Sequence, residues 1–174
     1  MTPSQQPLLP PHRLKVALFQ PQIAPNTGNI GRLCVASGTE LHLVRPMGFV
    51  LSDHQLKRSA MDYWPRLKLT LHDDDAAFFG ALGGTPLWFF SSRGTRAFWD
   101  AAFTDRDCLV FGSETRGLPE TVLLAHADRV LRIPQAADER CLNLSTSVGI
   151  ALYEALRRVA ARREDPRHDP ADAP

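Results

Sequence analysis

The sequence predicts one α/β domain, with a mainly parallel six-stranded sheet and helices on both faces of that sheet. Two observations support this prediction. Short apolar segments suited to strands alternate with segments of helical periodicity along residues 14–163. The segments 87–90 and 107–111 are also apolar enough to be buried on both sides, as strands of a parallel sheet are. A chain of 174 residues, 44% of them hydrophobic, can bury a core of this size.

Six segments predict strands, because each is apolar or alternating and most are bounded by turn residues. They cover residues 14–19, 40–44, 66–71, 87–90, 107–111 and 128–133. Residues 1–13, with four prolines, and residues 164–174 hold little that could pack, so we expect both to be flexible tails. The predicted domain therefore spans residues 14–163.

Five segments between and after these strands predict helices. The first covers residues 27–37 and ends at Gly38, and a short one begins at the capping pair Ser52-Asp53. A third covers residues 75–82, since the aspartates at 73–75 suit a helix start, and a fourth begins at Pro119. The last covers residues 144–163 and carries an apolar stripe made of Leu144, Val148, Ala151, Leu152, Ala155, Leu156 and Val159.

The composition narrows the class of protein. The formal net charge is +1, so any binding of nucleic acid must depend on local basic patches. No apolar run approaches the roughly 20 residues that a membrane span needs, and residues 1–7 lack the order of a signal peptide. Three cysteines without a CxxC pair suggest neither a disulfide framework nor a zinc site. We therefore expect a cytoplasmic protein with no membrane partner and no metal.

Three polar loops follow predicted strands, at residues 26–32, 111–119 and 134–145. In a parallel sheet such loops meet at the carboxyl ends of the strands, where ligands bind. Gly112 and Gly117 flank a carboxylate and a guanidinium in the second loop and would let the backbone approach a ligand closely. The sequence has no GxGxxG after its first strand and no GxxxxGK[ST], GxSxG or HExxH, so dinucleotide, NTP and zinc-protease sites lose support.

The residues alone leave the roles of the other two loops open. The amides of residues 26–32 open a helix and would suit an anion such as an RNA phosphate, but a simple capped helix start explains them equally. Asn143 and Ser145 in the third loop serve either a ligand or the cap of the last helix.

Taken together and in this order, NTGNIGRLC (26–34), FGSETRGLP (111–119) and CLNLSTSVGIALYEALRR (141–158) closely resemble the three motifs of the SPOUT-class RNA 2′-O-ribose methyltransferases. The resemblance covers residues 14–159. The short chain, without an added RNA-binding domain, resembles the minimal subfamily that methylates the wobble nucleotide of tRNA, a cytidine or a carboxymethylaminomethyl-type uridine. Residues 45–49 and 61–63 also look like that subfamily.

The resemblance implies a deep trefoil knot in the C-terminal part and a homodimer formed through the last helix. It implies S-adenosylmethionine as methyl donor, S-adenosylhomocysteine as product, tRNA as substrate and no metal. Seven residues would surround the cofactor, with Ile133 and Leu142 as apolar walls for adenine: Phe90, Ser91, Gly112, Gly117, Ile133, Cys141 and Leu142. Relatives often have proline at the position of Ser113 and serine at the position of Cys141. These differences change the side chains but leave the backbone contacts to the cofactor intact.

The same resemblance assigns the reacting groups. Arg32, Glu114, Asn143 and Ser145 would lie at the catalytic centre. Asn26, Arg116, Tyr153 and Arg157 would contact the RNA. Tyr153 is also open to a role in a subunit interface, although nucleotide contact is favoured. Lys57, Arg58, Arg157 and Arg158 either contact phosphates or form a solvated basic face.

The predicted function is transfer of a methyl group to the ribose 2′-hydroxyl of the tRNA wobble nucleotide. Two alternatives remain at this point. The enzyme could act on another tRNA position or on ribosomal RNA, or the chain could be a cofactor-binding RNA module without catalysis. The presence of Arg116 and of all four residues expected at the catalytic centre weighs against the second alternative.

Overall fold

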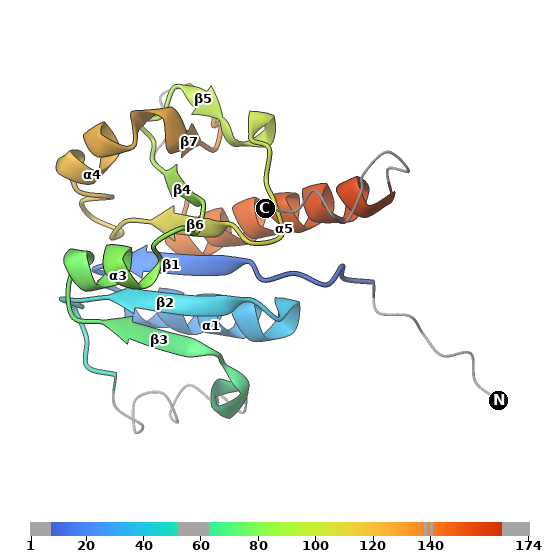
Figure 1. Cartoon of the computed structure of the whole chain (residues 1–174). Coiled ribbons are helices and arrows are strands. Elements are labelled where there is room, and N and C mark those ends of the chain that lie inside the picture. The colour runs from blue at the N-terminus through green and yellow to red at the C-terminus, as the bar shows by residue number, and fades with distance from the viewer. Residues whose placement is uncertain (1–7, 52–62, 138, 140, 165–174) are drawn as a thin grey trace.

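A computed structural model of the chain describes residues 8–51, 63–137, 139 and 141–164. Its centre is a sheet of seven strands, all paired in parallel, in the order β3-β2-β1-β6-β4-β7-β5 (Figure 1). The strands are β1 (Lys15–Phe19), β2 (Glu40–Val44), β3 (Leu69–His72), β4 (Leu87–Phe90), β5 (Arg96–Ala97), β6 (Cys108–Phe111) and β7 (Val130–Arg132). The α/β class and the parallel sheet are therefore confirmed.

The predicted number of six strands is wrong. The additional strand is β5, whose two residues pair with Leu131 and Arg132 of β7. A strand of two residues is too short to show a period in the sequence, which is why it was missed. The third predicted strand also starts later than residue 66, because Trp64–Arg66 form the 3-10 helix η1 and β3 begins at Leu69.

Four α-helices lie among the described residues: α1 (Ala24–Ser37), α3 (Asp75–Ala81), α4 (Glu120–Ala125) and α5 (Leu144–Glu164). Short 3-10 helices form at η2 (Phe98–Asp100) and η3 (Ala127–Arg129). As predicted, α1 ends at Gly38, whose φ is 76°, and an aspartate caps α3, since Asp74 accepts a hydrogen bond from the Ala77 amide. The helix predicted at Ser52-Asp53, the residues Lys57 and Arg58, and residues 1–7 and 165–174 lie outside the described residues.

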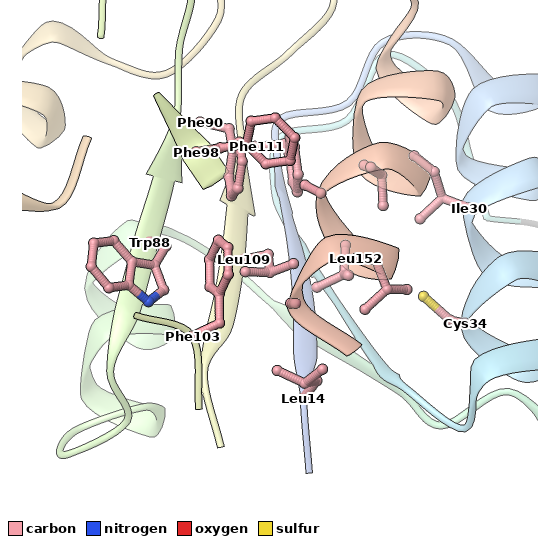
Figure 2. Close-up of a cluster of buried hydrophobic side chains, with 14 of the residues drawn as sticks. Leu14, Ile30, Cys34, Trp88, Phe90, Phe98, Phe103, Leu109, Phe111 and Leu152 are labelled. Carbon is pink, nitrogen blue, oxygen red and sulfur yellow. The ribbon is translucent and has the colours of Figure 1, made fainter. Parts of the chain in front are cut away.

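Two hydrophobic clusters cover the two faces of the sheet. The larger joins alternate strand residues to α1 and α5, and Figure 2 shows Leu152 of α5 beside Leu109 of β6 in this cluster. The smaller joins the other strand face to α3 and α4 through Phe78, Leu82 and Val122. The apolar stripe predicted on the last helix is buried in the larger cluster, so core packing accounts for it within one chain.

The segment just before β1 contacts the domain, although the sequence places it in a flexible tail. His12 Nε2 lies 2.8 Å from the carbonyl oxygen of Ser37, and the amide of Arg13 donates to the carbonyl of Asp105 at 2.6 Å. Helices that are long and apolar enough to cross a membrane do not occur among the described residues.

Candidate functional site

A cavity of about 500 Å³ opens at the carboxyl ends of β1, β6, β4 and β7, four neighbouring strands of the sheet. The loops that follow these strands form its walls, together with the start of α5. Most of the residues that the sequence assigns to the site line this cavity: Asn26, Phe90, Ser91, Gly112, Glu114, Arg116, Gly117, Ile133, Cys141, Leu142 and Asn143. Three loops far apart in the sequence thus share one cavity.

The loop after β6 is a tight turn over residues 113–117. The amide of Ser113 donates to the carbonyl of Gly117 at 3.2 Å, and the amide of Gly117 donates back at 2.9 Å. The hydroxyl of Ser113 also accepts a hydrogen bond from the amide of Arg116 at 3.2 Å. This closed turn directs the side chain of Glu114 away from the sheet core and toward the start of α1.

The structure gives a second explanation for Gly112 and Gly117, which were predicted from the sequence to let a ligand approach closely. A Cβ on Gly112 would lie 1.9 Å from the carbonyl carbon of Gly117, so the turn could not close over any other residue. Gly117 has a φ of 70°, in the left-handed region that other residues rarely adopt. Both glycines are therefore needed by the loop itself, before any ligand approaches.

Glu114 is the residue that ties this turn to the loop after β1. Its carboxylate accepts hydrogen bonds from the amide of Gln22 at 2.8 Å, the amide of Ile23 at 3.3 Å and the side-chain Nδ2 of Asn26 at 2.9 Å. Ile23 is the N-cap position of α1 and makes no side-chain cap of its own. A carboxylate at a helix start is stabilised by the free amides and by the helix dipole.

A second set of hydrogen bonds continues from Asn26 to the loop before α5. The Nδ2 of Asn143 donates to Oδ1 of Asn26 at 3.0 Å. The Oδ1 of Asn143 accepts hydrogen bonds from the amide and the hydroxyl of Ser145, at 2.8 and 2.7 Å, which caps α5. Glu114, Asn26, Asn143 and Ser145 thus form one hydrogen-bonded chain across three loops.

Part of the cavity wall is apolar. The rings of Phe90 and Phe111, at the ends of β4 and β6, stack with their centroids 4.6 Å apart and 13° between their planes (Figure 2). Ile133 and Leu142 add apolar side chains to the wall, and Leu142 is 37% exposed. A cavity of this size with apolar side chains beside fixed polar groups suits a small ligand that has both an aromatic and a polar part.

Four of the predicted site residues lie outside the cavity wall: Arg32, Ser145, Tyr153 and Arg157. Ser145 reaches the site only through Asn143. Arg32 is an exposed residue of α1, and its guanidinium carbon lies 5.7 Å from the ring centroid of Tyr63. Tyr153 is 50% exposed on α5. One chain therefore brings together the residues expected around the cofactor more completely than those expected around the RNA.

Arg157 is paired with a carboxylate of its own helix. Its Nε and Nη2 each lie 2.8 Å from an oxygen of Glu154, and the Nε of Arg158 lies 2.8 Å from the same carboxylate. The hydrogen bonds from Arg157 lower the pKa of Glu154, and those from Arg158 add to this effect. The guanidinium of Arg157 therefore forms an ion pair with Glu154 when no other anion is present.

Several residues of the site were missed in the sequence. Gln22 donates its amide to Glu114, while Arg93 and Gln135 line the cavity from the loops after β4 and β7. Their positions after predicted strands are the only signal that could have identified them. Tyr63 was noted only as part of a resembling segment, and nothing in its neighbourhood in the sequence points to Arg32.

The described residues contain no group of three or more His, Cys, Asp or Glu side chains that could hold a metal ion. Two of the three cysteines, Cys34 and Cys108, are buried, and burial raises the pKa of both thiols, that of Cys34 to about 12. Cys141 is exposed on the cavity wall.

The parallel sheet, with a hydrogen-bonded cavity at its strand ends, is the architecture of an α/β protein that binds a small ligand there. Comparison with protein families assigns it more narrowly. Residues 13–153 match the model of the SpoU rRNA Methylase family. The chain belongs to this family.

Relatives and solved structures agree with that assignment. The chain is 42% identical over 147 residues to the tRNA (cytidine(34)-2′-O)-methyltransferase of Escherichia coli K12, which covers 84% of this chain and 94% of that protein. It superposes with a TM-score of 0.82 on a structure described as giving insights into the 2-OH methylation of C/U34 on tRNA, at 46% identity, covering 87% of this chain and 99% of the other.

A more distant solved structure is an AdoMet-bound rRNA methyltransferase from Sinorhizobium meliloti, with a TM-score of 0.74 and 25% identity. The match covers 86% of this chain and 58% of the other, so a large part of that protein lies outside the match.

The cavity fits a bound S-adenosylmethionine on its own features. Apolar side chains at Phe90, Ile133 and Leu142 offer surfaces for a purine ring, and Asn26 and Asn143 of the hydrogen-bonded chain add polar groups to the same lining. The volume of about 500 Å³ lies in the range typical of small-molecule sites.

Proposed function

We propose that this protein transfers a methyl group from S-adenosylmethionine to the ribose 2′-hydroxyl of nucleotide 34, the wobble nucleotide, of tRNA. The observation that carries the proposal is the hydrogen-bonded chain Glu114–Asn26–Asn143–Ser145, which joins the three loops at the cavity. The 42% identity to an enzyme named for this reaction supports the choice of substrate.

Similarity favours this proposal over the main alternative, methylation of ribosomal RNA, since the chain is 46% identical to the structure concerned with tRNA C/U34 and 25% identical to the rRNA methyltransferase. The chain covers 99% of the structure concerned with tRNA C/U34 but only 58% of the rRNA methyltransferase. An anticodon loop is also a chemically suitable target, because the ribose of an unpaired nucleotide is accessible there.

When bound, the cofactor supplies an electrophilic methyl group: a bond forms between the ribose 2′-oxygen and the methyl carbon, the sulfur–methyl bond breaks, and S-adenosylhomocysteine and a proton are released. The protein's part is to position the two reactants, which can supply much of the rate acceleration. Phe90, Ile133 and Leu142 would hold the adenine side, and the turn 113–117, fixed by Glu114, would hold the opposite side.

Arg32 is proposed to act on the ribose. A guanidinium donates hydrogen bonds and does not accept them, and its pKa of more than about 12 keeps it protonated, so a role as general base is physically unfavourable. Arg32 would instead orient the 2′-hydroxyl and a neighbouring phosphate and stabilise the negative charge that develops on the oxygen. Arg116, Tyr153 and Arg157 are proposed RNA contacts.

Three further features complete the proposal: a trefoil knot in the C-terminal part, a homodimer through α5, and work in the cytoplasm, where tRNA is modified. The packing of α5 back against α1 and β6 is compatible with a threaded C-terminal part. The exposed side chains Ile150 and Tyr153 of α5, 38% and 50% exposed, are compatible with a subunit contact.

The test has two arms. The purified protein is incubated with S-adenosylmethionine and, in separate reactions, with tRNA and with ribosomal RNA from a strain that lacks this protein, and ribose methylation is mapped nucleotide by nucleotide. Methylation at nucleotide 34 is expected. If only another tRNA position or only ribosomal RNA is methylated, the proposed substrate is wrong. If calorimetry shows cofactor binding but neither RNA is methylated, the protein is a binding module without catalysis.

A further inference from the structure

The contact between Arg32 and Tyr63 points to a role for a residue outside the three sequence motifs. We propose that Tyr63 positions the guanidinium of Arg32 for the reaction and thereby sets the rate of methyl transfer. The inference rests on the proposed function, in which Arg32 acts at the ribose. Tyr63 itself is 5% exposed and does not line the cavity, so it is a positioning residue rather than a catalytic one.

Two contacts fix Tyr63 against one turn of α1. Its hydroxyl donates a hydrogen bond to the carbonyl oxygen of Gly28 at 2.6 Å. The centroid of its ring lies 5.7 Å from the guanidinium carbon of Arg32, within the range of a cation–π contact. Residues 28 and 32 are four apart on the helix and lie above one another on the same face. The buried ring thus spans the turn from which the arginine projects.

The position of the ring is itself fixed by close packing of η1 on α1. A Cβ on Gly31 would lie 3.2 Å from the ring of Trp64, 3.3 Å from Leu67 and 3.7 Å from the ring of Tyr63. The absence of a side chain at residue 31 therefore allows residues 63–67 to approach the helix. Tyr63 is carried by this segment and cannot shift without moving it.

The physical effect concerns the freedom of a long side chain. An exposed arginine samples many rotamers, and it loses that freedom each time it must meet a substrate. A buried aromatic face beneath the guanidinium favours the rotamers that lie over the ring. Arg32 therefore begins each encounter with the RNA partly ordered, and the rate of the chemical step should depend on the ring while the affinity for the cofactor should not.

The test measures single-turnover methyl transfer to tRNA with enzyme in excess, which keeps slow variants measurable. Tyr63→Leu removes the ring and is expected to lower the rate about tenfold. Tyr63→Phe keeps the ring and loses only the hydrogen bond to Gly28, so it should restore most of the rate. The dissociation constant for S-adenosylmethionine should stay within about twofold of wild type in both variants.

Leu69→Ala is the matched control, since Leu69 packs against the same hydrophobic cluster but lies in β3, outside the segment 63–67 that carries the ring. It should lower the melting temperature as much as Tyr63→Leu does and leave the rate near that of wild type. If Leu69→Ala and Tyr63→Leu lower the rate equally, Tyr63 is only structural and the inference fails.

A double-mutant cycle and a spectroscopic measurement complete the experiment. In an Arg32→Ala background, Tyr63→Leu should lower the rate less than about twofold, because the group it positions is gone.

The side-chain Nε–H resonance of Arg32, assigned by its loss in Arg32→Lys, should shift when the ring is removed. An unchanged resonance, or a tenfold loss that persists without Arg32, would overturn the inference. A wild type that methylates no RNA would overturn the proposed function, whereas an active wild type with an insensitive Tyr63→Leu would overturn the inference alone.

Discussion

Glu114 and Arg32 both belong to the proposed site, but the protein holds them in different ways. The Glu114 carboxylate accepts three hydrogen bonds from residues 22, 23 and 26 and closes one wall of the cavity. The Arg32 guanidinium is exposed and lies over the ring of Tyr63. We call the region of turn 113–117, Asn26 and Asn143 the cofactor side, and the region of Arg32 and Tyr63 the substrate side.

The difference indicates which part of the site is built before a ligand arrives. The cofactor side is assembled from side-chain and backbone hydrogen bonds within one chain and needs little rearrangement. The substrate side presents the exposed guanidinium of Arg32, which suits a large, negatively charged ligand. Mutations on the cofactor side should therefore change cofactor affinity, and mutations on the substrate side should change the rate.

The largest expected effect is on the substrate side. Arg32→Ala should lower the rate of methyl transfer about 10²- to 10³-fold, because it removes a donor aimed at developing negative charge. Cofactor affinity, measured by calorimetry, should be unchanged. Arg32→Lys keeps the charge but not the planar fork and should fall between wild type and Arg32→Ala at every pH tested. Near-normal rates in both variants would leave Arg32 without either role.

The next effect is expected on the cofactor side. Glu114→Ala leaves the amides of Gln22 and Ile23 and the side chain of Asn26 without their acceptor, which should cost about 2–3 kcal/mol and lower the melting temperature by about 5–10 °C. Cofactor affinity should fall by about tenfold or more, since the wall formed by turn 113–117 loses its anchor. Glu114→Gln, which keeps an acceptor oxygen, is the matched variant. A loss of rate with unchanged cofactor affinity would place Glu114 on the substrate side instead.

The third prediction concerns stability and should affect both sides of the site equally. His42 and His72 are buried in β2 and β3, with His42 Nδ1 and His72 Nε2 2.8 Å apart. Burial lowers the pKa of His42 to about 4 and also lowers the pKa of His72. Because these values lie below the unfolded value of about 6.5, the unfolded chain binds more protons in this range.

Stability should therefore be fully present above about pH 6.5 and should be lost as the pH falls toward about 4. We expect the melting temperature to fall by about 5–10 °C over this range beyond the change caused by other groups. The His42→Asn variant should flatten this dependence. A slope that is the same in the variant and in wild type would show that the pair does not cause it.

The smallest effect is expected at Arg157, which already pairs with Glu154. Arg157→Ala should weaken tRNA binding only about two- to threefold and lower the salt dependence of binding by about one contact. Binding titrations at several salt concentrations measure both quantities. An unchanged salt dependence would show that Arg157 remains with Glu154 when tRNA binds, and would remove it from the proposed RNA contacts.

Much of the fold follows from local patterns in the sequence. The apolar stretch of β6 and the apolar stripe of α5 predict a buried strand and a helix packed on the core. The aspartates before α3 predict a helix start. The start of α1 shows the limit. It begins at Ala24, three residues before the predicted start at Thr27, because its free amides near residue 23 are met by Glu114, about ninety residues later in the chain.

The site shows the same limit. The three motifs located the loops, and the loops do meet at one cavity. The sequence could not show that Gly112 is required by the closure of its own turn, since the clash that a Cβ would make is with Gly117. Nor could it connect Tyr63 with Arg32, because that contact depends on how closely η1 approaches α1 and not on any spacing along the chain.

The attachment of Glu114 at the start of α1 has a mechanical consequence. Arg32 lies six residues beyond Asn26 on the same helix, about 9 Å along its axis. A short helix moves as a rigid rod, so a ligand that displaces turn 113–117 would also displace the base of this rod and change the direction in which Arg32 points. Binding of the cofactor at turn 113–117 would then affect how Arg32 meets the RNA, so the position of α1 would couple the two binding steps.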